Sequence, residues 1–114
     1  MSEAPTEIRL KRAERVLVVS FSDGTSYALP FEYLRVFSPS AEVRGHGLSE
    51  PLLVKGKERV MVTAVEPIGN YAVKLAFDDG HDTGLYTWSF LRELGADQAK
   101  NLARYQERLA AEPR

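Results

Sequence analysis

Apolar and polar residues alternate along the first third of the chain with the two-residue period of β-strands. A β-branched run that is apolar on both faces predicts a central strand, and a shorter run between charged residues predicts an edge strand beside it. Asp23-Gly24 suits a tight hairpin turn, and Pro30 suits the first position of a helix, where no N–H is needed. We therefore expect an edge strand, a central strand, a returning strand and a short helix at residues 8–10, 16–21, 25–29 and 31–35.

The pattern dissolves over residues 36–58, where glycine, proline and serine recur and only residues 52–54 favour a strand. A segment of this length without clear structure is typical of a functional or a mobile loop. Beyond it, Thr87 and Asp97 suit helix N-caps, and Gly95 suits the residue that ends a helix. The elements expected here are strands at 59–65, 71–77 and 82–86, a turn at 66–70, and helices at 88–94 and 98–111.

The two halves of the chain carry the same landmarks. Phe21-Ser22-Asp23-Gly24 returns as Phe77-Asp78-Asp79-Gly80, and Leu34-Arg35 returns as Leu91-Arg92. The offset grows from 56 residues at the Asp-Gly pair to 57 at the Leu-Arg pair, so the second copy holds one extra residue between its landmarks.

This order of elements predicts an α+β fold. We expect two layers, with a mainly antiparallel sheet built from two hairpin–helix repeats and an additional C-terminal helix within residues 96–111. The 114 residues are enough for one hydrophobic core, so we expect residues 1–114 to form a single domain.

Composition narrows the classes of function. The net charge of −1 gives no general attraction to nucleic acid or to a membrane surface, and no apolar run approaches the roughly 20 residues of a membrane span. The chain has no cysteine, which excludes disulfides, thiolate nucleophiles and iron–sulfur clusters held by its own sulfur. The charged N-terminus does not resemble a signal peptide. We expect a cytoplasmic protein without nucleic-acid or membrane partners, and the sequence leaves the oligomeric state open.

The second copy gathers the residues with the most chemistry. His81 can bind a metal or carry a proton, and Asp79 and Asp82 supply hard oxygen ligands beside it. Gly80 and Gly84 allow the backbone to approach a bound group closely. Together these residues predict a divalent-metal site made of His81, Asp79 and Asp82.

The same residues also have a purely structural interpretation. Asp79-Gly80 suits a tight turn, as Asp23-Gly24 does without any histidine, and Trp88 aligns with Phe31 of the first copy, which indicates a core residue. An iron centre with two histidines and one carboxylate would need His46 as its second histidine. No nucleophile elbow, phosphate loop or dinucleotide fingerprint is present, so we expect no enzyme.

The repeated landmarks, together with residues 66–71 and 79–88, resemble the domain at the N-terminus of γ-butyrobetaine hydroxylase over about residues 5–95. Domains of this type also occur as small stand-alone bacterial proteins of unknown function and beside some P-loop iron–sulfur cluster carriers. The resemblance implies that the catalytic iron and 2-oxoglutarate of the hydroxylases belong to a separate C-terminal barrel, which we do not expect within this chain. The helix at 96–111 lies outside the resemblance.

In the hydroxylases, three cysteines and one histidine of this domain hold a structural zinc. By resemblance, the cysteine positions fall on Ser38, Ser40 and Val43, and the histidine falls on His81. A serine hydroxyl is a poor zinc ligand and valine is none, so we expect no cofactor and no zinc site of this kind. The resemblance still implies that the 36–58 loop lies against the second hairpin.

We predict a non-catalytic binding or accessory module that acts through a protein partner, which the resemblance links to iron–sulfur or iron-enzyme handling. The alternatives are a divalent-metal (iron or zinc) binding protein that uses His81 with nearby carboxylates, and a repeat that serves architecture alone. The predicted partner surface joins the second hairpin to the loop and comprises Asp79, Gly80, His81, Asp82, Gly84, Trp88, Ser38, Ser40 and His46.

Overall fold

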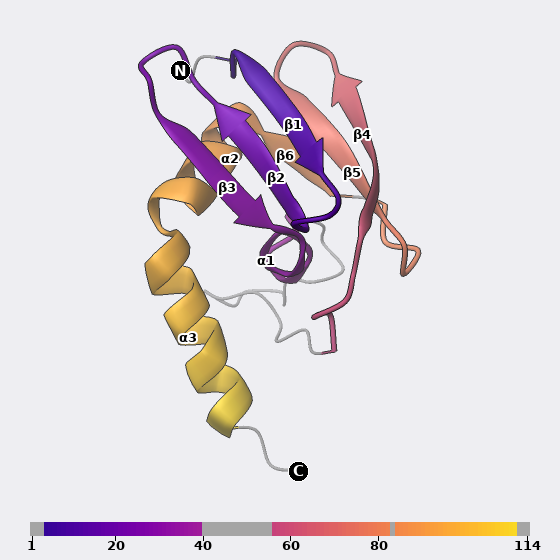
Figure 1. The fold of residues 1–114 in the computed structure, drawn as a ribbon, viewed down its shortest axis with the longest axis vertical. Helices are drawn as coiled ribbons and strands as arrows, with labels where there is room; N and C mark the ends of the chain where they lie inside the picture. The colour runs from indigo at the N-terminus through magenta and orange to yellow at the C-terminus, as the bar shows by residue number, and fades with distance from the viewer. Residues whose placement is uncertain (1–3, 40–55, 83, 112–114) are drawn as a thin grey trace.

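The computed structural model describes residues 4–39, 56–82 and 84–111. Six strands form two antiparallel three-stranded sheets, β1-β2-β3 and β4-β5-β6, and helices follow each sheet (Figure 1). The elements are β1 (Glu7–Lys11), β2 (Val16–Ser20), β3 (Ser26–Pro30), α1 (Phe31–Val36), β4 (Val62–Ile68), β5 (Ala72–Phe77), β6 (Leu85–Thr87), α2 (Trp88–Ala96) and α3 (Gln98–Ala111). The predicted α+β fold with two hairpin–helix repeats and a C-terminal helix is confirmed.

The two sheets share one hydrophobic core. Leu17 and Leu29 of the first sheet and Val62 and Leu75 of the second are fully buried in the same cluster. The strand that is apolar on both faces, β2, lies in the centre of its sheet as predicted, with β1 at the edge. Figure 1 shows α2 behind the first sheet and α3 extending away from both sheets. No helix in the described ranges is long and apolar enough to cross a membrane.

The strand boundaries of the second repeat differ from the prediction. β4 begins at Val62 and continues to Ile68, so the expected strand at 59–65 was placed too early. Pro67, read as part of a turn, lies inside β4 and pairs with Val73. A proline is tolerated there because β4 is an edge strand, and the backbone groups on its outer edge form no hydrogen bonds to a neighbouring strand. The returning strand is likewise shorter than the predicted 82–86 and begins only at Leu85.

Both helices that follow a hairpin begin as the capping rules suggest, with one shift. Thr87 is the N-cap of α2, as predicted, and its Oγ1 accepts a hydrogen bond from the Phe90 N–H at 3.1 Å. Pro30 is the N-cap of α1 and not its first helical residue.

The end of α2 was predicted wrongly. Gly95 lies within the helix, and Asp97 is its C-cap, directly before α3. A Cβ on Gly95 would lie less than 3.0 Å from three ring atoms of Tyr27 on β3. The glycine is therefore needed for close helix–sheet packing rather than for a change of backbone direction.

The two repeats exchange charged contacts. Arg35 of α1 in the first repeat donates from Nε to the Asp79 carboxylate in the turn of the second repeat at 2.8 Å. In return, Arg92 of α2 forms an ion pair with Asp23 in the turn of the first repeat. Each Asp-Gly landmark thus supplies the aspartate, and each Leu-Arg landmark supplies the arginine, of an ion pair that the structure contains twice.

Two buried tyrosines connect the repeats in the same reciprocal manner. The Tyr33 hydroxyl donates to the carbonyl of Leu94 at 2.7 Å, and the Tyr86 hydroxyl donates to the carbonyl of Leu34 at 2.6 Å. Burial raises the pKa of both phenols, which keeps them protonated as donors. Each repeat thus supplies a hydrogen-bond partner for the helix of the other.

Candidate functional site

The turn of the second hairpin has the same backbone structure as that of the first. His81 N–H donates to Asp79 Oδ1 at 3.1 Å, as Thr25 N–H donates to the turn aspartate of the first copy at 3.0 Å. Gly80 has a φ of 91°, close to the 87° of Gly24, a left-handed conformation that favours glycine. Asp79-Gly80 therefore serves the turn, and His81 stands where the first copy has a threonine.

Asp79 connects two segments that are distant in sequence. Its Oδ2 accepts from Arg35 Nε at 2.8 Å and from Lys57 Nζ at 2.7 Å, so the carboxylate binds residues on both sides of positions 40–55. Burial acts to raise the pKa of Asp79, but the hydrogen bonds from Lys57, the His81 backbone and Arg35 outweigh it and lower the pKa to about 2. Asp79 is thus a fixed anion at neutral pH.

Ser38 and His81 form a buried polar contact beneath this ion cluster. Ser38 is fully buried and His81 is 8% exposed, and Ser38 Oγ lies 2.9 Å from His81 Nε2. A Cβ on Gly84 would lie 2.5 Å from Ser38 Oγ, so the glycine lets the hairpin approach Ser38 rather than a bound group. The structure thus brings the beginning of the predicted loop against the second hairpin.

The described donors do not match the zinc site of the hydroxylases. Ser38 and His81 supply one hydroxyl and one imidazole, while Ser40 and Val43 lie outside the described residues, as does His46. Across residues 4–39, 56–82 and 84–111, no group of three or more His, Cys, Asp or Glu side chains is placed to hold a metal ion. A hydroxyl and a single imidazole fall short of the four ligands of structural zinc.

The predicted carboxylates do not converge with the histidine ring on a shared position. Both oxygens of Asp79 accept hydrogen bonds from protein groups, and Asp82 is exposed. The ring of His81 is instead hydrogen-bonded to Ser38 and packs against Phe77, with 6.1 Å between ring centroids. The arrangement attaches Ser38 and Lys57, near the two ends of the predicted loop, to the hairpin through a hydrogen bond and an ion pair.

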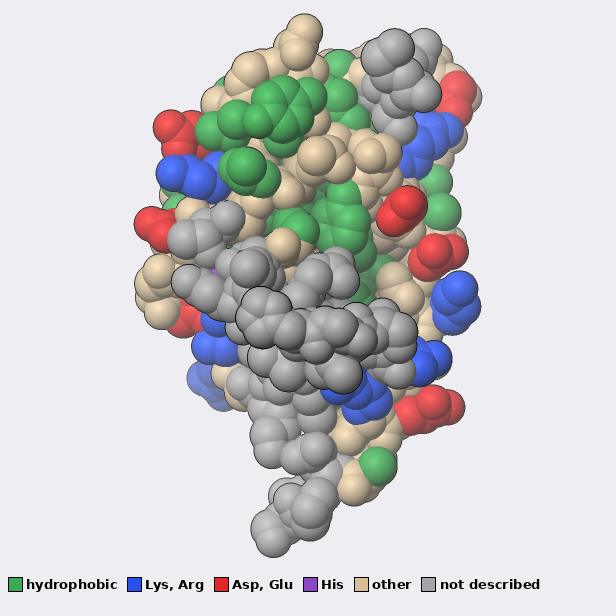
Figure 2. Space-filling model, turned by 180° about the vertical axis from the view of Figure 1, so that it is seen from behind, with side chains coloured by type: hydrophobic (Ala, Val, Ile, Leu, Met, Phe, Trp, Pro, Cys, Tyr) green, Lys and Arg blue, Asp and Glu red, His purple; other side chains and the backbone are tan. Residues whose placement is uncertain are grey.

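Hydrophobic side chains reach the surface on the same hairpin. Among the described residues, the exposed large hydrophobics are Tyr71, 50% exposed, and Leu85, 40% exposed. Trp88 lies between the core and the surface, and its Nε1 donates to the Asn70 carbonyl at 2.7 Å. Figure 2 shows hydrophobic side chains at the surface on the side of the molecule that faces away from the viewer in Figure 1.

Sequence reasoning missed Tyr71 and Leu85, although the repeat holds a signal for them. The strand registers align Leu85 with Ala28. Tyr71 aligns with Arg15, because the carbonyl of each accepts the N–H of the first helical residue, at 3.1 and 2.9 Å respectively. A small residue and a charged residue of the first copy are thus replaced by exposed apolar side chains in the second.

Comparison with known proteins gave one family and several structures. The family model described as "Gamma-butyrobetaine hydroxylase-like, N-terminal" matches residues 8–92. An NMR solution structure is 50% identical, with a TM-score of 0.83, over 96% of this chain and 82% of the other. A second NMR structure is 47% identical, with a TM-score of 0.83, over 97% of this chain and 87% of the other.

A crystal structure from Acidithiobacillus ferrooxidans is 46% identical, with a TM-score of 0.69, over 81% of this chain and 92% of the other. It is described as a protein of unknown function in the DUF971 family. No match was found among curated proteins. These similarities identify relatives of the same size and fold, and none of their descriptions assigns a catalytic activity to such a domain.

Proposed function

The chain belongs to the family of γ-butyrobetaine hydroxylase-like N-terminal domains, and within this family we propose that it is a non-catalytic accessory module that binds a partner protein through its second hairpin. The proposed surface is formed by Tyr71, Leu85 and Trp88, where β5 begins and β6 passes into α2, at the end of the hairpin opposite the Asp79–His81 turn. Aromatic and large apolar side chains at the surface are typical of the centres of protein interfaces.

The asymmetry between the two repeats carries this proposal. Both hairpins build the same turn and the same backbone hydrogen bond at the helix start, and each supplies part of the shared core. The exposed positions differ, because Leu85 replaces Ala28 and Tyr71 replaces Arg15. Core packing does not require these exposed side chains, and exposing apolar surface is unfavourable unless a partner covers it.

The nature of the partner follows from the family alone. Because domains of this type accompany iron–sulfur cluster carriers and the iron-dependent hydroxylases, we place the partner among proteins that handle iron–sulfur clusters or iron enzymes. The contacts described above do not depend on this assignment.

Photocrosslinking tests the surface with a control supplied by the repeat. A photoreactive residue is placed at Leu85 or at its counterpart Ala28, and adducts are isolated from cells that express the full chain. We expect a saturable adduct from position 85 only. The purified partner should then bind the Leu85→Asp variant at least about tenfold more weakly, the size of an interface hot spot, and the Ala28→Asp variant with unchanged affinity. Equal adducts at both positions, or full affinity of Leu85→Asp, would contradict the proposal.

Metal binding by His81 with Asp79 and Asp82 stays a separate prediction. An amide NMR titration with Zn²⁺, and with Fe²⁺ under anaerobic conditions, tests it independently of any protein partner. Saturable shifts at micromolar metal, centred on His81 and weakened in Asp82→Asn, would support a metal-binding protein. Weak and scattered shifts would remove this alternative and leave the partner-binding proposal as it stands.

A further inference from the structure

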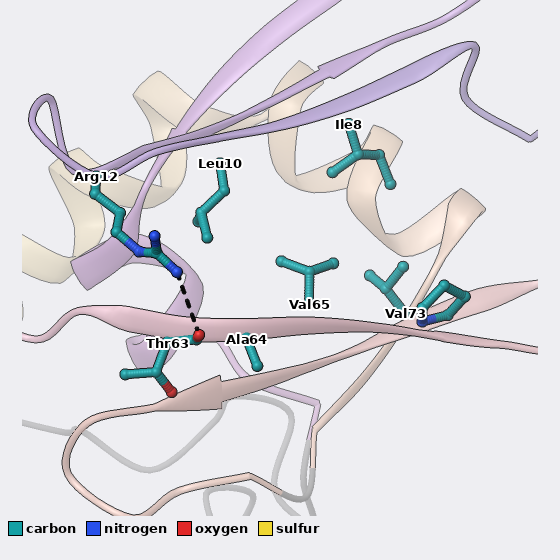
Figure 3. A pocket seen from close by; sticks show the side chains of 8 residues that line it. Ile8, Leu10, Arg12, Thr63, Ala64, Val65 and Val73 are labelled. Carbon is teal, nitrogen blue, oxygen red and sulfur yellow. Dashed lines mark hydrogen bonds between the residues drawn. The ribbon is translucent and has the colours of Figure 1, made fainter.

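An apolar groove of about 520 Å³ lies between the two sheets. Its walls are the edge strands β1 and β4, with Val73 of β5 at one side (Figure 3). Ile8 and Leu10 project from β1 toward Val65 of β4, and Arg12 stands at one end, where it reaches Thr63. The groove shares no residue with the surface proposed above.

The two walls occupy equivalent places in the two repeats. The strand registers align Ile8 with Val65 and Leu10 with Pro67, so both sides present apolar side chains at matching positions. Within the described residues, β1 and β4 each pair with one strand only, which leaves the outer edge of each without a neighbouring strand. Edge strands beside an apolar groove are the structural setting for binding an extended peptide by strand addition.

The two edges are not equally suited to pairing. Pro67 has no N–H to donate, and the register of β4 is irregular between Val62 and Ala64. β1 pairs with β2 without interruption from Glu7 to Lys11 and contains no proline. An added strand would therefore pair with β1, while β4 would contribute apolar side chains to the opposite wall.

Arg12 gives the groove a charged end. Its Nη2 lies 3.5 Å from the Thr63 carbonyl, at the limit of a hydrogen bond, and Arg15 reaches the Glu58 carbonyl at 3.4 Å. Within the part of the chain that the structure describes, neither arginine is ion-paired with a carboxylate. A carboxylate is the group that a guanidinium binds best, by two parallel hydrogen bonds.

From this geometry we propose that the β1–β4 groove binds an extended segment of a partner protein, with apolar side chains at alternate positions and a carboxylate at the end beside Arg12. The main chain of the segment pairs with β1, and alternate side chains fill the space between Ile8, Leu10 and Val65. The acidic residue fixes the register and direction of the segment.

The test uses the full ¹⁵N-labelled chain and two peptide pools, followed by amide NMR. Each peptide is about six residues long, the usual length of a strand, with Val, Ile or Leu alternating with Thr. One pool has Asp at both ends and the other has Asn. We expect saturable shifts in β1 and β4, with the Asp pool bound about three- to fivefold more tightly, as for an exposed ion pair.

Matched variants identify the carboxylate contact. Arg12→Gln should abolish the preference for the Asp pool, whereas Arg9→Gln removes the same charge from the exposed face of β1 and should preserve it. Val65→Phe, which enlarges the side chain that points from β4 toward Ile8 and Leu10 (Figure 3), should weaken both pools at least about tenfold.

Three results would overturn the proposal. The first is the absence of saturable shifts in β1 with either pool. The second is an equal effect of Arg12→Gln and Arg9→Gln. The third is binding of decanoate in the groove without binding of peptide, which would assign the groove to amphiphilic carboxylates. Because the probes do not depend on the second hairpin, failure here leaves the Leu85 and Ala28 comparison unaffected.

Discussion

At Ser38, a hydroxyl occupies a position where the resemblance to the hydroxylases implies a thiolate. The hydroxyl remains within 2.9 Å of His81 Nε2, so a hydrogen bond joins segments that a metal would join in the hydroxylases. Both side chains are buried, which makes the contact worth more than a surface hydrogen bond. The pair therefore attaches Ser38, at the beginning of the loop, directly to the hairpin.

Replacing Ser38 by alanine should reveal the strength of this attachment. Ser38→Ala removes the bond to a buried imidazole nitrogen, and we expect a loss of about 1–3 kcal/mol in the free energy of unfolding, measured by urea denaturation. Ser26→Ala is the matched control, because Ser26 is exposed and bonds only Ser20, at 3.1 Å, among the described residues. A loss equal to that of the control would show that the Ser38–His81 contact contributes no stability.

Asp79 makes the stability of the protein depend on acid pH. The hydrogen bonds that it accepts lower its pKa from 3.8 to about 2 in the folded chain. A carboxyl group with a lower pKa in the folded state contributes stability that is complete above the unfolded pKa and is lost as the pH falls through the folded pKa. The difference in unfolding free energy between the native chain and Asp79→Asn should therefore shrink as the pH falls from about 5 to about 2.

Urea denaturation at a series of pH values measures this difference. Asp82→Asn, an exposed change in the same hairpin, should follow the native chain throughout. A difference for Asp79→Asn that stays constant across the pH range would contradict a role of the ionised carboxylate.

At the scale of the element, α2 is shaped by its packing against β3 and not by helix propensity. Gly95 lies inside the helix, where glycine is normally unfavourable, because the ring of Tyr27 occupies the space that a Cβ would need. The propensity of the residue and the tertiary contact therefore have opposite effects, and the contact decides which residue is tolerated.

Gly95→Ala should accordingly destabilise the protein. The higher helix propensity of alanine favours the variant by about 1 kcal/mol, but the overlap with Tyr27 should cost about 1–3 kcal/mol and outweigh it. In a Tyr27→Ala background the overlap is absent, and the same change should become stabilising. A double-mutant cycle in urea measures both signs. Stabilisation by Gly95→Ala in the native background would refute the packing argument.

The sequence predicts best those elements whose conformation depends on residues that are neighbours in the chain. β2 and the Asp79-Gly80 turn follow from alternation and from turn chemistry. Pro67 usually indicates a turn, but here it lies in an edge strand, where a proline is tolerated. Gly95 usually indicates a helix end, but here it lies inside a helix that packs closely against Tyr27. The extra residue of the second repeat lies between His81 and α2, in the segment that contains the short strand β6.

The candidate site was predictable only in part, for a similar reason. Resemblance placed Ser38 near His81, and turn chemistry placed Asp79 at the tip of the hairpin. The link from Asp79 to Lys57 joins residues 22 apart, and that to Arg35 joins residues 44 apart. No period or local motif encodes such pairs. The strand registers show that the exposed Tyr71 and Leu85 replace Arg15 and Ala28 of the first repeat.

At the scale of the whole molecule, each repeat is incomplete without the other. The turn aspartate of one repeat binds the helix arginine of the other in both directions, and the buried tyrosines do the same with helix carbonyls. The core is likewise shared, since residues of both sheets are buried in one cluster. A single repeat would expose these apolar and polar groups together.

Separated halves should therefore fold only in each other's presence. We expect fragments 1–47 and 48–114 to be unfolded alone, with little amide dispersion in NMR spectra, and to form a native-like one-to-one complex when mixed. A break between Lys74 and Leu75, inside the central strand β5, should prevent this recovery because it interrupts the pairing with both β4 and β6. If the first fragment alone gave the dispersed spectrum of a folded sheet, the exchanged contacts would be additions to two independent units. Recovery only on mixing, with the Tyr86→Phe change in the second fragment weakening the complex, would show that the exchange itself holds the fold together.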